Sequence, residues 1–105
     1  MKLPSHTNHI KGKSKGPTVV IMGGLHGNEP LGVLLIEKLK KLLEKEEIKG
    51  EIYLILGNPQ AYKANKRFID CDLNRIFHLN FGGNAKKLNT EEKRALEIAP
   101  ILKKA

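Results

Sequence analysis

The fold is decided by residues 18–32, which read TVVIMGGLHGNEPLG. Residues 18–22 are β-branched or apolar without alternation, a pattern typical of a strand that is buried on both faces. A glycine-rich loop follows, and Pro30 stands where a helix begins, with Asn28 or Glu29 as its cap. The stretch therefore predicts a strand, a tight loop and a helix N-terminus in direct succession.

A helix and a second strand follow this stretch. Leucines recur at spacings of three and four, which predicts an amphipathic helix from Leu31 to about Glu46. Residues 52–56, after Gly50, form a second apolar strand. Strand, helix and strand in this order predict a βαβ unit with a right-handed crossover and parallel strands.

The remaining segments flank this unit. Residues 1–17 are polar and contain glycine and proline, which indicates an arm or an edge strand. Residues 57–88 have little periodicity, and a loop of that length is usually functional or disordered. A last helix begins at Asn89 or the next residue, because Asn89 and Glu92 have the spacing of a capping box. We expect Pro100 to end or kink this helix.

These elements predict an α/β fold. We expect a single domain over residues 1–105 with a mostly parallel sheet and flanking helices, made of the βαβ unit and the C-terminal helix. Two strands without a polar face need covering on both sides and neighbours at both edges. The chain supplies only part of that cover, so it reads as a truncated first part of a larger α/β domain.

Composition argues against several classes of protein. No apolar run approaches the roughly 18 residues of a membrane helix, so we expect no membrane partner. Residues 1–6 lack the apolar core of a signal peptide. The single cysteine, Cys71, excludes an internal disulfide framework and suits a reducing compartment. We therefore expect a cytoplasmic protein.

The net charge of +8 invites a nucleic-acid hypothesis, but the pattern of charge argues against it. Most cationic residues are lysines, and many alternate with glutamate, as in residues 37–47, which is typical of a solvated helix face. Tryptophan is absent, so a surface that stacks bases is not expected. We expect no nucleic-acid partner; a basic nucleic-acid-binding protein would instead show affinity that falls steeply with salt.

Two polar segments follow the two predicted strands, where ligands collect in an open parallel sheet. In the first segment, His26 and Glu29 lie three residues apart across the strand-to-helix junction. A neutral imidazole and a carboxylate are ligands that suit Zn²⁺. On spacing alone, a capped helix beside a surface histidine explains the pair better, because short motifs often match by chance.

The second polar segment is residues 67–77, where Arg67 and Arg75 flank Asp72 and Asn74 in an apolar frame. Guanidinium groups bind carboxylates through paired hydrogen bonds, and an arginine also stabilises the oxyanion that forms when water attacks a carbonyl. Structural ion pairs between the arginines and the nearby aspartates explain the segment equally well.

Together the segments resemble the succinylglutamate desuccinylase/aspartoacylase family, which belongs to the zinc carboxypeptidase-like hydrolases. The similarity lies in the order and spacing of Gly-Gly-Leu-His-Gly-Asn-Glu-Pro-Leu-Gly at residues 23–32, Asn-Pro-x-Ala at 58–61, and Arg-Phe-Ile-Asp-Cys-Asp-Leu-Asn-Arg-Ile-Phe at 67–77. It covers about residues 18–100. The resemblance implies a partial zinc-carboxypeptidase-like fold, corresponding to the N-terminal half of such an enzyme.

The resemblance also implies an activity and a cofactor. The reaction would be hydrolysis of the amide bond of an N-acyl amino acid or a related small anionic substrate. His26 and Glu29 resemble the first two zinc ligands, and Zn²⁺ activates water and polarises the carbonyl in such enzymes.

The resemblance assigns the second segment to the substrate. Arg67 resembles the catalytic residue that polarises the scissile carbonyl and steadies the oxyanion. Asn74 and Arg75 resemble the pair that holds a substrate carboxylate, and Asp72 resembles the acidic residue that orients this cluster.

The chain departs from the family in what it lacks. The family's third zinc ligand, a histidine, and its general-base glutamate lie downstream of the last predicted helix. His78 is near the site in sequence, but catalytic geometry disfavours it as a substitute ligand. Glu91, Glu92 and Glu97 are expected on a surface helix and offer no base. The missing groups would come from the rest of a longer chain, from a complementary C-terminal polypeptide or from a homo-oligomer.

Two hypotheses therefore stand beside the nucleic-acid one. The first is a zinc-dependent hydrolase of this family, completed by groups outside residues 1–105. The alternative is a non-catalytic remnant that keeps carboxylate binding by Arg67, Asn74 and Arg75 without turnover.

Overall fold

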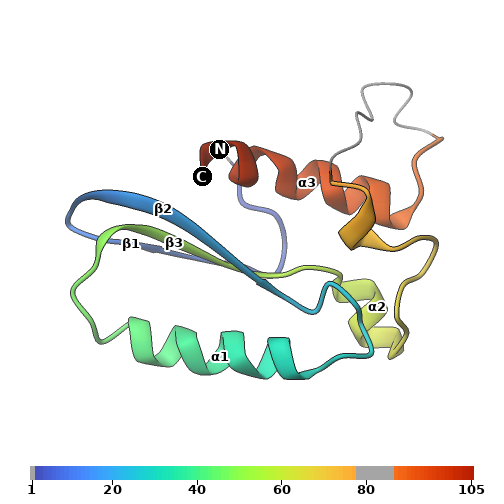
Figure 1. The fold of residues 1–105 in the computed structure, drawn as a ribbon, viewed down its shortest axis with the longest axis horizontal. Coiled ribbons are helices and arrows are strands. Elements are labelled where there is room, and N and C mark those ends of the chain that lie inside the picture. Colours follow the sequence, from blue (N-terminus) through green and yellow to red (C-terminus); the bar gives the residue numbers. More distant parts are fainter. Residues whose placement is uncertain (1, 78–86) are drawn as a thin grey trace.

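The computed structural model describes residues 2–77 and 87–105. Figure 1 shows the order of its elements along the chain. They are β1 (Thr7–Lys11), β2 (Ser14–Gly23), α1 (Leu31–Leu43), β3 (Lys49–Leu56), α2 (Pro59–Ala64), the single helical turn η1 (Leu73–Arg75) and α3 (Thr90–Lys104).

The strands form one three-stranded sheet in the order β1–β3–β2. β2 and β3 are parallel and are joined by α1, which confirms the predicted βαβ unit and the α/β class. β1, which lies in the predicted arm or edge strand, pairs antiparallel with β3. Over the described ranges the sheet is thus mixed, with one parallel and one antiparallel pair, rather than mostly parallel.

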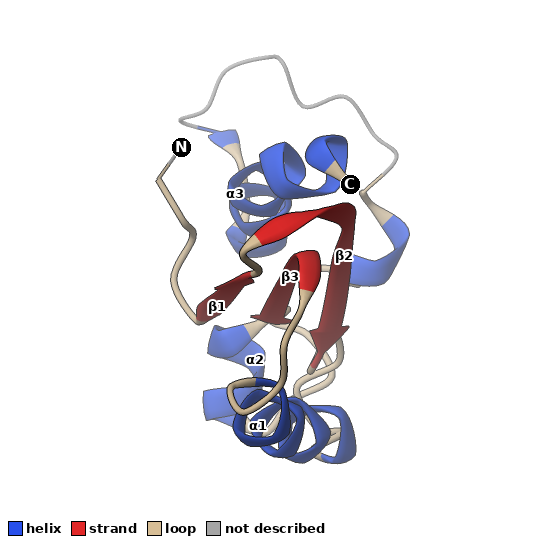
Figure 2. Cartoon of the chain, turned by 90° about the vertical axis from the view of Figure 1, so that its left-hand side faces the viewer, coloured by secondary structure: helices blue, strands red, loops and turns tan. Residues whose placement is uncertain are grey.

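Helices lie on both faces of the sheet. Figure 2 shows α3 on one side of the strands and α1 on the other. Tyr53 and Ile55 of β3 pack with Ile98 and Ile101 of α3 in the main core cluster. Leu54, between them, points to the opposite face and is also fully buried. The central strand β3 is therefore buried on both faces, as its apolar sequence predicts.

The prediction of burial on both faces is wrong for β2. β2 is an edge strand, and Val19 is 41% exposed. Both β2 and β3 also begin earlier than their apolar runs, at Ser14 and Lys49, because the polar residues Ser14 and Lys49 pair with each other across the two strands. Hydrogen bonding of the backbone, which apolar patterns do not report, extends the strands here.

Helix α1 differs from its prediction in three respects. It ends at Leu43 rather than near Glu46. Its N-cap is Pro30, and neither Asn28 nor Glu29 caps it, because no side chain bonds to the first turn. Its buried residues are Val33 and Ile36. Of the leucines that predicted the helix, Leu39 and Leu43 are half-buried. The others are largely exposed, namely Leu31, Leu34, Leu35 and Leu42.

Helix α3 confirms its predicted start. The side chain of Asn89 accepts from the backbone of Glu92, and the side chain of Glu92 accepts from the backbone of Asn89. Of the two outcomes expected at Pro100, an end or a kink, the end is wrong, since α3 continues to Lys104. Ile101 is fully buried against the sheet, and this packing holds the last turn in place despite the missing proline N–H.

The segment at residues 57–88, predicted to have little regular structure, contains α2 and η1 in its described part. α2 begins at the dipeptide Asn58-Pro59, where the Asn58 side chain accepts from the backbone of Ala61 and proline takes the first helical position. Among residues 2–77 and 87–105, no helix has the length and apolarity to cross a membrane.

Candidate functional site

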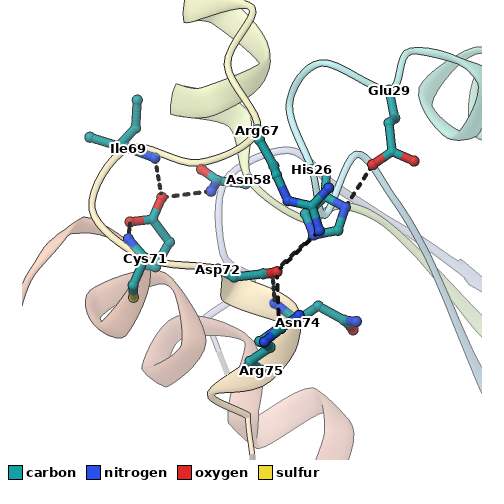
Figure 3. A network of polar contacts seen from close by, with 10 residues as sticks. His26, Glu29, Asn58, Arg67, Ile69, Cys71, Asp72, Asn74 and Arg75 are labelled. Carbon is teal, nitrogen blue, oxygen red and sulfur yellow. Dashed lines mark hydrogen bonds and ion pairs between the residues drawn. The ribbon is translucent and has the colours of Figure 1, made fainter.

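The loop between β2 and α1 places His26 between two carboxylates. Its Nδ1 lies 2.6 Å from Oε2 of Glu29, and its Nε2 lies 3.0 Å from Oδ1 of Asp72 (Figure 3). The His26 side chain is 17% exposed, whereas that of Glu29 is 63% exposed. The imidazole thus contacts Asp72 on its more buried side and the exposed Glu29 on its surface side.

Glycines allow this loop to adopt its path. Gly24 has a φ of +70°, a conformation that other residues rarely adopt. Gly27 passes so close to α2 that an added Cβ would lie 2.1 Å from the carbonyl carbon of Ala61. The Gly27 N–H donates to the carbonyl of Arg67 at 3.2 Å, so the loop that bears His26 is tied directly to the second polar segment.

Asp72 lies at the centre of the site. Its Oδ1 accepts from His26 and from the backbone N–H of Asn74, which caps η1. Its Oδ2 lies 3.6 Å from Nη2 of Arg67 and 3.5 Å from Nε of Arg75. Burial by itself would raise the pKa of Asp72, but its hydrogen bonds to His26 and Asn74 and the charges of His26 and Arg67 outweigh burial and hold that pKa below its ordinary value.

The two arginines remain available to a ligand. Their side chains are 53% exposed for Arg67 and 79% exposed for Arg75, and their contacts with Asp72 are long. Exposed ion pairs of this kind are weak, so the guanidinium groups keep most of their N–H donors for another anion. Asn74, beside them on η1, is also exposed. The arrangement can bind a carboxylate and can donate to a carbonyl oxygen on which negative charge develops.

The structure brings together all six residues that the sequence singles out. His26 and Glu29 lie at one end of the network, and the Arg67, Asp72, Asn74 and Arg75 segment lies at the other. His78, weighed as a substitute ligand, lies outside the described residues.

The donor set at His26 fits a metal ion. A ligating histidine usually donates its second ring nitrogen to a carboxylate, which fixes the tautomer, and Asp72 accepts from Nε2 in this way. On the other side of the ring, Nδ1 lies against the Glu29 carboxylate, and an imidazole nitrogen and a carboxylate oxygen are both donors that Zn²⁺ accepts. Within the described ranges, no group of three His, Cys, Asp or Glu side chains forms a complete metal cluster.

The prediction that Glu91 lies on the surface of its helix is wrong. Glu91 is fully buried and accepts hydrogen bonds from the Asn58 side chain and from the backbone N–H groups of residues 69–71. The signal for this burial was present in the helical spacing, because Glu91 shares one face with Ala95 and Ile98. Glu97 is exposed as expected.

The chain is similar to known proteins over most of its length. Residues 15–105 match the model of the succinylglutamate desuccinylase/aspartoacylase catalytic domain. The chain is 41% identical over 85 residues to a probable aspartoacylase of Nostoc sp., covering 80% of this chain and 29% of that protein. It is 32% identical over 91 residues to a succinylglutamate desuccinylase of Pseudomonas paraeruginosa, covering 85% of this chain and 26% of that protein.

Solved structures show the same similarity. An aspartoacylase family protein from Mesorhizobium loti superposes with a TM-score of 0.76 at 30% identity, over 91% of this chain and 30% of that one. A succinylglutamate desuccinylase/aspartoacylase from Rhodobacter sphaeroides gives a TM-score of 0.76 at 28% identity, over 94% and 30% of the two chains. The chain thus spans less than a third of the length of these relatives. By its family-model match, its relatives and its fold, the chain belongs to the succinylglutamate desuccinylase/aspartoacylase family.

Proposed function

We propose that this chain forms the part of a zinc-dependent deacylase that holds two metal ligands and binds the carboxylate of an N-acyl amino acid. The curated relatives are named aspartoacylases and succinylglutamate desuccinylases, and both names describe cleavage of an acyl group from an acidic amino acid. The third zinc ligand and the general base would come from outside residues 1–105, from the rest of a longer chain, a complementary polypeptide or a second copy.

The observation that supports this proposal is the position of Asp72. One of its oxygens contacts His26 and the other contacts Arg67 and Arg75. A single carboxylate therefore orients a histidine suited to a metal and two arginines suited to a substrate. Ion pairs that only stabilise the fold do not require the adjacent contact between His26 and the exposed Glu29.

Each residue has a defined role in the proposed reaction. His26 and Glu29 would hold the zinc ion, which supplies Lewis-acid activation of water and of the scissile carbonyl when bound. Arg67 donates to the carbonyl oxygen as negative charge develops on it. Arg75 and Asn74 bind the carboxylate of the substrate and so align the amide bond with Arg67.

Native mass spectrometry of the chain with and without zinc tests this proposal. We expect one zinc ion per chain, or per small oligomer, and loss of that ion in His26→Ala. His9→Ala is the matched control, because His9 also contacts a glutamate and is 24% exposed, close to the 17% of His26, but lies in β1 away from the site. Zinc that survives His26→Ala contradicts the assignment of the metal site, whereas a folded chain that binds no zinc means that the site needs the groups from outside residues 1–105.

The exposed arginines also favour a second candidate function, carboxylate binding without catalysis. The side chains of Arg67 and Arg75 are both more than half exposed, so a carboxylate can reach them from solvent. Titration calorimetry with N-acetylaspartate, with and without zinc, separates the two functions. Binding that is weakened by Arg75→Ala but indifferent to zinc supports the binding module. Binding that zinc strengthens, with the gain lost in His26→Ala, supports the metal site of the deacylase.

A further inference from the structure

The buried carboxylate of Glu91 binds the backbone between Arg67 and Asp72 of the candidate site. Its Oε2 accepts from Nδ2 of Asn58 at 2.8 Å and from the N–H of Ile69 at 2.9 Å. Its Oε1 accepts from the N–H of Asp70 at 2.8 Å and from that of Cys71 at 3.0 Å. Three consecutive amides outside any helix or strand are therefore satisfied by one side chain.

This contact lies at a sensitive point in the sequence. Ile69, Asp70 and Cys71 lie between Arg67 and Asp72, so the backbone that Glu91 holds sets the spacing between the arginine and the aspartate. A second contact fixes the same junction in the reverse direction, because Oδ2 of Asp70 accepts from the N–H of Thr90 at 2.8 Å. The first turn of α3 therefore both accepts hydrogen bonds from residues 69–71 and donates one to Asp70.

The chemistry of the contact requires a charged carboxylate. All four partners of Glu91 are donors, and only an ionised carboxylate accepts at both oxygens without presenting a proton of its own. Burial alone would raise the pKa of Glu91, but the bonds from Ile69, Asn58, Asp70 and Cys71 outweigh it and hold that pKa below its ordinary value. A fully buried charge is costly unless hydrogen-bond donors such as these compensate it.

We propose that Glu91 is a positioning residue of this site, which sets the relative placement of Arg67 and Asp72 by holding the backbone of residues 69–71. It acts on the substrate through Arg67 and on His26 through Asp72, and it touches neither substrate nor metal itself. The proposal rests on the function proposed above, because it assigns Glu91 a part in that same carboxylate and metal site.

Glu91→Gln is the informative variant. The glutamine keeps the shape but turns one oxygen into an NH₂ group, which then faces two donors instead of accepting from them. We expect the segment to shift and the affinity for N-acetylaspartate, measured by titration calorimetry, to fall by about tenfold, since outer partners of a site commonly have effects of that size. The affinity for zinc alone is expected to fall with it, because Asp72 moves relative to His26.

Glu92→Ala is the matched control. Glu92 is the next residue on the same helix turn and bonds the backbone of Asn89, not residues 69–71. Its loss weakens the helix cap and lowers the melting temperature, but the affinity for N-acetylaspartate should stay within about twofold of the unmodified chain. If both variants weaken binding in proportion to their loss of melting temperature, Glu91 is only structural and the proposal is refuted.

A double-mutant cycle adds a readout that global destabilisation does not move. Glu91→Gln should weaken binding less in an Arg67→Ala background than in the unmodified chain, because the residue through which it acts is already gone. Equal losses in both backgrounds contradict the proposed route.

Amide hydrogen exchange of the unmodified chain does not depend on the variant folding. The amides of Ile69, Asp70 and Cys71 should exchange slowly although they belong to no helix or strand. Exchange as rapid as that of exposed loop amides overturns the proposal. If the unmodified chain binds neither zinc nor N-acetylaspartate, the proposed function itself fails; if it binds and Glu91→Gln binds equally well, only the role of Glu91 fails.

Discussion

Substitution of Gly27 by alanine should destabilise the chain strongly. The new Cβ would lie 2.1 Å from the carbonyl carbon of Ala61, 2.3 Å from its oxygen and 2.4 Å from the carbonyl oxygen of Lys66. All three atoms belong to the backbone, so no side chain can rotate to make room. Overpacking of this kind costs about 1–3 kcal/mol. Displacing the loop also breaks the Gly27–Arg67 backbone bond, worth about 1 kcal/mol.

We therefore expect Gly27→Ala to lower the free energy of unfolding by about 3 kcal/mol. Urea unfolding followed by circular dichroism measures this change. Gly32→Ala is the milder comparison, because its Cβ would meet the Cα of Gly23 at 3.1 Å, a tight contact rather than an overlap, and alanine favours the helix in which Gly32 lies. A Gly27→Ala chain within 0.5 kcal/mol of the unmodified one would refute the argument that close backbone contact fixes this loop.

Three further outcomes are expected. Hydrogen bonds from Lys104 and His9 lower the pKa of Glu51 from 4.5 to about 2. The ionised Glu51 therefore contributes stability that is complete above pH 4.5 and is lost as the pH falls toward 2. Glu51→Gln should flatten that part of the acid-unfolding curve. Asn89→Ala removes the capping box of α3 and should cost about 1 kcal/mol in urea unfolding, while an unchanged midpoint would contradict a role for the cap. Arg75→Ala should weaken binding of N-acetylaspartate about tenfold by calorimetry, yet change stability by less than about 1 kcal/mol because the side chain is largely exposed; unchanged binding would remove Arg75 from the site.

The sequence predicts those parts of the fold that depend on local pattern. The apolar run at 52–56, the leucine spacing after Pro30 and the Asn89–Glu92 pair identify β3, α1 and the start of α3 because each reflects neighbours within one element. The clustering of His26 with residues 67–75 was also predictable, since both segments follow parallel strands.

What the sequence did not predict depends on contacts between distant segments. Glu91 was expected on a surface helix because glutamates are rarely buried. Its helical spacing places it on the buried face, but burial of the charge becomes favourable only when the amides of 69–71 and the side chain of Asn58 surround it. The leucines of α1 satisfy a helical period, yet the fully buried side chains of this helix are Val33 and Ile36. No local pattern reports how much surface a neighbouring element can cover.

The shared carboxylate of Asp72 has a thermodynamic consequence. One oxygen of Asp72 contacts His26 and the other contacts Arg67 and Arg75. An anion that draws the arginines away from Asp72 therefore changes the charge around the carboxylate that holds the His26 imidazole. Two ligands that each alter the same group are energetically linked, and the linkage is reciprocal. A factor by which a bound carboxylate alters the affinity of His26 for a cation must equal the factor by which that cation alters the affinity for the carboxylate.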